Sequence, residues 1–467
     1  MVYLPESGAD MKKHKYDAPR CMDLFALALI GFALNFICAL PGAAQRLTRD
    51  EALQRAQEAS HELRIRSEWI QLSKLQAQEA DRRRLPQLDF GGSYLYTSEV
   101  MSFTQPQTTV VIPGLGSAVI PGRETRFGDN HSVDFKLQIT QPVFTGFRLR
   151  SAFLAAQEGV RQQQAEYEII RLQILQKTEE SYLQAQKAAA LRSAARLHLE
   201  RLRRHLEEAQ ERLAAGVAPE EVVARAQFGV LQAKQKLQET ENLFEFAQLN
   251  LREILDLPDS DEELRLDSLA APQTEISTLQ EEYAFRQRPE FKSLEAQTTA
   301  AVHRAAMERA AYYPALTAFG IVDYGKPGID KIANDWMIYE MIGVNLSWTL
   351  WDWNLRKIRV EQARGINRQL QESERLLRSN VRLQVLNAQK SLDNAIRKLE
   401  IADEGARLAR DVLKWVEARY AQGVATEREY QDALDAVVSS DTDRIAALAD
   451  YHLARTALKY ALGSSLL

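Results

Sequence analysis

The sequence predicts a mainly α-helical protein in which one unit occurs twice in tandem and each copy carries a β-hairpin. The duplication is visible at two turns, where residues 212–218 read Arg-Leu-Ala-Ala-Gly-Val-Ala and residues 419–425 read Arg-Tyr-Ala-Gln-Gly-Val-Ala, 207 positions later (423 minus 216). Two stretches without proline, 147–215 and 354–422, indicate long helices. Segments of alternating apolar and polar residues after each first helix predict the hairpins.

The first 44 residues have the pattern of an export signal. Four basic residues precede an apolar stretch from 24 to 40, and small residues follow as far as Ala44. We expect cleavage after Ala44; an uncleaved anchor helix is the alternative. Both cysteines, Cys21 and Cys38, lie in this segment. The mature chain would therefore have no thiol and no disulfide.

Each copy of the unit begins with a helix. Thr48 and Glu51 form a capping-box pattern, and the helical pattern continues to about Arg84. The counterpart begins near Ser277 and continues to Tyr313. Both patterns stop at a proline. The chain thus divides into a leader, a first copy, a linker and a second copy: residues 1–44, 45–257, 258–275 and 276–467.

The pattern then changes to a period of two, which predicts strands with one apolar face. In the first copy the apolar residues of the two strands are Leu88, Phe90, Tyr94, Tyr96, Val133, Phe135, Leu137, Ile139 and Val143. In the second copy they are Leu316, Ala318, Val322, Tyr324, Trp336, Ile338, Ile342, Val344, Leu346, Trp348 and Leu350. The connection from 101 to 130 is longer than the one from 325 to 334, as expected of hairpin tips.

Each proline-free stretch would form a helix of roughly 100 Å at about 1.5 Å per residue. Apolar positions step by four and three along both, which predicts a coiled-coil seam: Ala195, Leu199, Leu202, Leu206, Ala209 and Leu213, then Ala402, Ala406, Ala409, Leu413, Val416 and Tyr420. Gly216 and Gly423 end these helices, and Pro219 and Thr426 begin the returning ones.

Strands with one apolar face need an apolar environment on that face. Ten to fourteen residues suffice for a tilted strand to cross a bilayer, about the length expected here. Aromatic residues on the apolar faces favour the outer membrane: Tyr94, Tyr96, Tyr324, Trp336 and Trp348. Four strands cannot close a barrel, so several chains must share one. These considerations leave dimer, trimer and tetramer open, and a soluble sandwich is the alternative.

Several motifs occur in an order that resembles the TolC family of outer-membrane efflux and secretion ducts. They are the helix start at Thr48, the junction Gln141-Pro142-Val143-Phe144-Thr145-Gly146, the segment Arg288-Pro289-Glu290 and the two Arg-x-x-x-Gly turns. The resemblance covers residues 47–463. It implies a homotrimer with a twelve-stranded outer-membrane β-barrel, a coiled-coil α-barrel in the periplasm, a periplasmic adaptor protein and an inner-membrane pump. The implied function is passive export of small toxic compounds such as drugs, metals or dyes.

The resemblance also implies two kinds of site. The tip turns would dock the adaptor through Arg212, Gly216, Val217, Ala218, Arg419, Gly423, Val424 and Ala425. The entrance would be closed by Glu429 and Asp432, which share a helix face and would form carboxylate rings, with Tyr420 tying neighbouring helices together. The first copy departs from the pattern with Val222 and Arg225, and Ala425 replaces an arginine. We therefore expect the second copy to carry the gate and the first to be chiefly scaffold.

Other functions receive less support from the sequence. The net charge of −5 is spread without a basic stripe, which argues against nucleic acid. No zinc-hydrolase spacing, phosphate loop or nucleophile elbow is present, so we expect no enzyme, metal or cofactor. His198 and His205 are expected to be solvated helix residues. Two alternatives stay open: the duct of a type I protein secretion system, and a periplasmic coiled-coil interaction protein without a pore.

Overall fold

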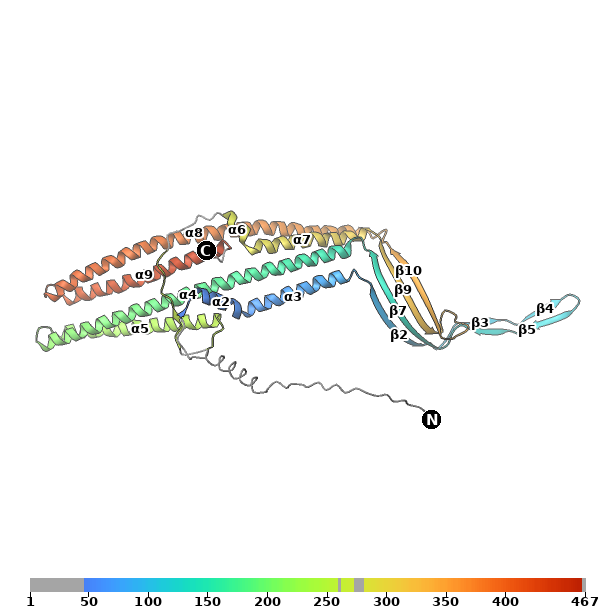
Figure 1. Cartoon of the computed structure of the whole chain (residues 1–467), viewed down its shortest axis with the longest axis horizontal. Helices are drawn as coiled ribbons and strands as arrows, with labels where there is room; N and C mark the ends of the chain where they lie inside the picture. The colour runs from blue at the N-terminus through green and yellow to red at the C-terminus, as the bar shows by residue number, and fades with distance from the viewer. Residues whose placement is uncertain (1–45, 259–261, 273–280, 464–467) are drawn as a thin grey trace, which may run out of the picture.

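The structure, a computed structural model, describes residues 46–258, 262–272 and 281–463. The expected export signal and the expected helix start near Ser277 lie outside these residues. The molecule is elongated, with a long helical body joined to a four-stranded sheet at one end (Figure 1). Within the described residues, no helix has the length and apolarity required to cross a membrane.

The duplication is reproduced element by element. The first copy contains α2 (Arg49–Ala59), α3 (His61–Arg82), β2 (Gln87–Tyr96), β7 (His131–Phe144), α4 (Arg148–Ala214) and α5 (Glu220–Ile254). The second contains α6 (Glu281–Gln287), α7 (Pro289–Arg309), a 3₁₀ turn (Ala310–Tyr312), β9 (Ala315–Lys326), β10 (Met337–Ser347), α8 (Leu355–Ala421) and α9 (Glu427–Ala461). The two long helices, α4 and α8, both have 67 residues, and their ends are offset by 207 positions (355 minus 148, 421 minus 214). The predicted long helices are thus confirmed.

The first helix is broken where the sequence pattern predicted continuity. Thr48 caps α2 in a complete capping box with Glu51, as predicted. The chain leaves helical geometry at Ser60, whose side chain accepts a hydrogen bond from the backbone N–H of Leu63 and so begins α3. Serine competes well for this position because its hydroxyl replaces a missing backbone partner. The break between α6 and α7 falls at Arg288 and Pro289, where proline removes an N–H donor.

The sheet is antiparallel and combines the hairpins of both copies in the order β10-β9-β7-β2. Lys136 of β7 lies opposite Asp323 of β9, which in turn lies opposite Tyr339 of β10. This register places the alternating apolar residues on one face, where most of them are exposed. The predicted strands are confirmed, except that Trp336, Trp348 and Leu350 lie just outside β10. Strands β2 and β10 remain as edges.

The long connection of the first hairpin, expected to be a tip loop, contains further strands. It forms two further two-stranded sheets: β3 (Ser102–Gln105) with β6 (Arg123–Arg126), and β4 (Thr108–Ile112) with β5 (Gly116–Ile120). Together they form a ribbon that continues away from the helical body beyond the sheet (Figure 1). A short parallel pair, β1 (Arg46–Leu47) and β8 (Arg265–Leu266), joins the residues just before α2 to the linker.

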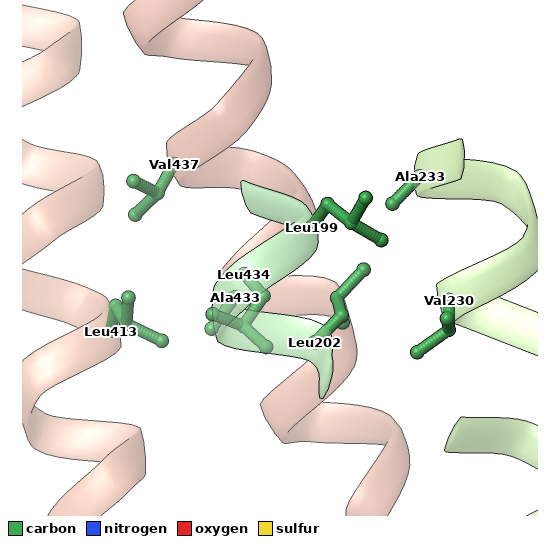
Figure 2. Packing of buried hydrophobic residues seen from close by; sticks show 8 residues of the cluster. All are labelled: Leu199, Leu202, Val230, Ala233, Leu413, Ala433, Leu434 and Val437. Carbon is green, nitrogen blue, oxygen red and sulfur yellow. The ribbon is translucent and has the colours of Figure 1, made fainter. Parts of the chain in front are cut away.

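The helical body is arranged in the order α5-α4-α9-α8, because α4 packs on α5 and α9, and α9 on α8. Figure 2 shows the core near the ends of these helices, where Leu199 and Leu202 of α4 lie against Val230 and Ala233 of α5. Leu413 of α8 and three residues of α9 complete the cluster: Ala433, Leu434 and Val437. Of the predicted seam, Leu199, Leu202 and Leu413 are buried in this core, and Leu206, Ala409 and Val416 are partly buried against it. The two copies pack on each other through α4 and α9.

A buried ionic cluster also joins the two copies, midway along the body. The carboxylate of Glu179 on α4 lies 3.0 Å from the Nζ of Lys459 on α9 and accepts a 3.1 Å hydrogen bond from the hydroxyl of Tyr460. Arg49 of α2 is 3.3 Å from the other carboxylate oxygen. The Glu179 and Lys459 side chains are both almost completely buried, so each charge depends on the other for compensation.

Candidate functional site

The two tip turns have nearly the same geometry. Gly216 and Gly423 adopt φ values of +73° and +74°, the left-handed conformation that glycine adopts without steric cost. The N–H groups of Val217 and Ala218 donate to the carbonyl of Arg212 at 2.9 and 3.2 Å. The same bonds recur from Val424 and Ala425 to Arg419, at 2.9 and 3.3 Å. Such paired bonds satisfy the last carbonyls of the helices.

Each turn presents an apolar side chain at the end of the molecule. Val217 is 78% exposed and Val424 is 65% exposed. Ala425, in contrast, is buried. All eight predicted tip residues thus lie in two similar turns at one end of the helical body, with Ala425 buried within the second turn. Their role in docking stays a prediction.

Tyr420 lies at the centre of a cluster just behind the second turn. Its hydroxyl donates a 2.6 Å hydrogen bond to the Oε2 of Glu427, the first residue of α9. Its ring stacks on Tyr430, with 4.9 Å between centroids and 15° between planes. The guanidinium of Arg212, from the first copy, lies 4.8 Å from the centroid of the Tyr420 ring. Tyr420 therefore contacts α4 and α9 as well as its own helix.

His205 connects this cluster to the first hairpin. It is 3% exposed, so the prediction of a solvated side chain is wrong for this residue. Its Nε2 donates to the Oε1 of Glu427 at 2.6 Å, and its ring lies 4.7 Å from that of Tyr430. The prediction rested on the residues next to His205 in the sequence. In the structure, α9 packs against α4 and covers the side chain of His205.

The charge of Glu427 is stabilised by its hydrogen bonds. Burial acts to raise the pKa of this carboxyl group, but the hydrogen bonds from His205, Tyr420 and Gln431 hold the pKa below its usual value. Burial and the bond to Glu427 raise the pKa of Tyr420, so the phenol remains protonated and acts as a donor. Burial likewise raises the pKa of Tyr430 to about 12. The cluster thus has one anion surrounded by donors across three helices.

The two predicted gate carboxylates lie outside this cluster. Glu429 accepts hydrogen bonds from the N–H of Thr426 at 2.7 Å and from its hydroxyl at 2.9 Å, completing the capping box of α9. These bonds lower the pKa of Glu429, and Arg419 at 3.4 Å contributes in the same direction. Asp432 is exposed, with Arg428 at 3.9 Å. Both carboxylates remain available to solvent in the single chain.

The departures of the first copy are accounted for by packing. Val222 lies against an apolar cluster of Ala209, Val223 and Ala226 that closes the first hairpin. Arg225 pairs with Glu221 at 2.6 Å on the surface. The first copy nevertheless supplies His205 and Arg212 to the Tyr420 cluster, and its role as chiefly scaffold stays a prediction. The sequence analysis missed His205, Glu427 and Tyr430 as members; the only signal was their position within one or two turns of the tips.

Histidine, cysteine and acidic side chains do not assemble into a metal centre in the part of the chain that the structure describes. There, no group of three or more such residues is arranged to hold a metal ion. His198 lies partly buried near Asp435, and burial lowers the pKa of this histidine. His198 takes no part in the hydrogen bond between His205 and Glu427.

The fold is shared with solved outer-membrane proteins, two of them described as channels. The structure is similar to MtrE of Neisseria gonorrhoeae in its open state, with 18% identity over 90% of this chain and 89% of the other and a TM-score of 0.71. It is also similar to VceC of Vibrio cholerae (15% identity, 90% and 97% coverage, TM-score 0.70). CmeC of Campylobacter jejuni is a third match (15% identity, 89% and 85% coverage, TM-score 0.70).

Comparison with curated protein sequences finds no match. The sequence profile described as outer membrane efflux protein, however, matches residues 52–256 and 282–464. These two segments coincide with the two copies of the duplicated unit and cover most of the chain. The resemblance to the TolC family and the expected place in the outer membrane are thereby confirmed. The chain belongs to the outer membrane efflux protein family.

Proposed function

We propose that three copies of this chain form a passive duct that exports small toxic compounds such as drugs, metals or dyes. The duct would cross the outer membrane as a shared β-barrel and continue through the periplasm as a helical tunnel. A periplasmic adaptor protein and an inner-membrane pump would supply the cargo and the energy. Because the chain is a channel-type protein, we infer no enzymatic activity.

The observation that carries this proposal is the pair of open edges on the single chain. The sheet ends at β2 on one side and β10 on the other, and both strands lack a second neighbour among the described residues. A membrane-spanning sheet cannot leave its edge groups unpaired, so β10 of one copy would pair with β2 of the next. Eight strands would form a barrel filled by its own side chains, whereas twelve from three copies leave a lumen.

The helical body has matching open edges. The helix order places α5 and α8 at opposite sides, and each bears a stripe of exposed large apolar residues. The α5 stripe consists of Phe228, Leu231, Leu243 and Phe246; the α8 stripe consists of Leu376, Leu383, Ile401, Leu408 and Trp415. Head-to-tail packing of α8 on the α5 of the next copy would bury both stripes and close a ring.

In this ring the tip turns surround the entrance. We propose that the Tyr420 cluster holds α8 and α9 against α4 and so keeps the entrance narrow. Glu429 and Asp432, repeated three times, would add rings of exposed carboxylate that favour cations. The exposed Val217 and Val424, with the turn glycines beside them, offer six apolar positions to an adaptor.

The test of the duct is its current. The purified protein should have the mass of a trimer. After reconstitution into planar bilayers, it should pass ions. Trp415→Ala, in the α8 stripe, should reduce the trimer fraction, whereas Lys414→Ala, next to it but outside the stripe, should not. A trimer that passes no current would contradict the duct and favour a coiled-coil interaction protein.

The cargo needs a separate experiment. Cells that lack the gene should accumulate a cationic dye and regain export when the gene is restored. Normal dye export with loss of a secreted protein from the medium would instead indicate the duct of a protein secretion system.

A further inference from the structure

The ribbon beyond the sheet contains an uncharged head on a charged stalk. The stalk is β3 with β6, which carries Arg123, Glu124 and Arg126. The head is β4 with β5, and residues 105–122 contain no charged side chain. Six large apolar residues of the head are exposed: Val110, Val111, Ile112, Leu115, Val119 and Ile120.

The two faces of the head differ. Pairing of Val110 with Ala118 and of Ile112 with Gly116 places these residues on one face with Ile120, which makes that face apolar apart from Thr108. The other face mixes apolar and hydroxyl side chains: Thr109, Val111, Ser117 and Val119. Only the first face is suited to dry packing, and we refer to it as the apolar head face.

The position of the ribbon on the sheet argues that the head lies in water, beyond the bilayer. The helices join the sheet at one end of the strands, and the ribbon leaves from the opposite end (Figure 1). At its base, Tyr96 lies opposite His131, and Tyr324 stacks on Trp336 with 5.0 Å between centroids. Such aromatic residues lie at the membrane interface, so the ribbon is beyond it.

An isolated two-stranded hairpin is at best marginally stable in water, and exposed apolar surface of this kind marks a binding face. The base of the ribbon is held in place: the N–H of Thr97 donates to the carbonyl of Asn130 at 2.8 Å, and that of Gly128 to the carbonyl of Lys331 at 2.6 Å. The head has no packed partner element among the residues that the structure describes, although its base is held in place. This implies that the head is completed by another molecule.

We propose that this molecule is the same chain: the three heads of one trimer pack together through their apolar faces over the mouth of the barrel. The inference rests on the proposed trimer. The ribbon is continuous with β2, the edge where one copy would meet the next, so each head stands near a neighbour. Five residues at about 3.4 Å give a head of about 17 Å, and twelve strands about 4.8 Å apart enclose a mouth roughly 18 Å across or wider. The heads are therefore long enough to meet on the axis.

Cysteine crosslinking tests this arrangement in the full-length protein with Cys21→Ser and Cys38→Ser as background. A disulfide requires Cα atoms within about 7 Å. Under mild oxidation in the membrane, Val110→Cys on the apolar head face should give disulfide-linked dimers of the chain. Val111→Cys, one residue away on the other face, is the matched control, and its yield should be at least fivefold lower. Ile332→Cys, on the β9–β10 connection, should give no dimer.

The outcomes separate this proposal from the one on which it rests. Trimer mass is measured on the same samples before oxidation. Trimers without a Val110→Cys dimer would overturn the packing of the heads and leave the duct intact. Equal yields at positions 110 and 111 would also overturn it, because they would indicate mobile ribbons that collide. Attachment of lipid to a photoreactive group at position 110 would assign the head to the membrane instead. Loss of the trimer itself would overturn the proposed function.

Discussion

The Tyr420 cluster allows one prediction to be worked through in detail. Tyr420→Phe removes the 2.6 Å hydrogen bond to Glu427 and leaves the ring, and therefore its stacking on Tyr430, unchanged. Glu427 keeps its bonds to His205 and Gln431, so no buried charge is left without a partner. The change therefore isolates one bond between α8 and α9.

The magnitude follows from the type of bond. A hydrogen bond to a charged group contributes about 1.5–3 kcal/mol, and the partial exposure of Tyr420 favours the lower end. A loss of about 1.5 kcal/mol per chain shifts a closed–open equilibrium roughly tenfold. If three copies act together, the shift approaches a factor of about 1000. The open fraction of the entrance should rise accordingly.

The assay is single-channel recording in planar bilayers, with thermal unfolding as a check on the fold. Tyr420→Phe should increase conductance or open probability. Tyr430→Phe is the matched control, since it keeps the stacked ring and, among the described residues, its hydroxyl has no hydrogen-bond partner. Wild-type currents in Tyr420→Phe would refute the reasoning, and equal opening in both variants would show that ring packing, not the hydrogen bond, holds the entrance.

Three further predictions concern stability, followed by thermal or denaturant unfolding. Glu179→Ala leaves the buried ammonium of Lys459 without its 3.0 Å partner and should lower the free energy of unfolding by about 3–5 kcal/mol. Adding Lys459→Met should recover part of this loss, and equal stability of the single and double variants would contradict the argument. Gly423→Ala should lower the free energy of unfolding by only about 1–2 kcal/mol, since an added Cβ would touch nothing. Gly146→Ala, in contrast, should prevent assembly, because its Cβ would lie 2.6 Å from a backbone oxygen. Burial lowers the pKa of His198 below 6.5, so the stability that the neutral ring allows is complete above pH 6.5 and is lost as the pH falls towards the lowered pKa. His198→Gln should flatten this decline, and parallel pH profiles of the variant and the wild type would count against the prediction.

Much of the architecture could be predicted because its signals are local. A period of two or of about 3.6 in apolar residues specifies a strand or a helix within a few residues, and Gly216 and Gly423 mark helix ends by backbone conformation alone. The break at Ser60 was missed because a serine inside a helical pattern is ambiguous until its side chain is seen to accept the N–H of Leu63. The head of the ribbon was missed because its short strands lack any alternation with polar residues.

The sequence by itself determined the duplication, the length of α4 and α8, the strand faces and the position of the tips, since each follows from spacing along one chain. Tertiary structure alone decided which side chains meet. His205 and Glu427 are 222 positions apart, and their 2.6 Å contact depends on how α4 and α9 are rotated and shifted against each other. That relation arises from the packing of Leu199, Leu202 and Leu434 in one core, and no periodicity along the chain encodes it.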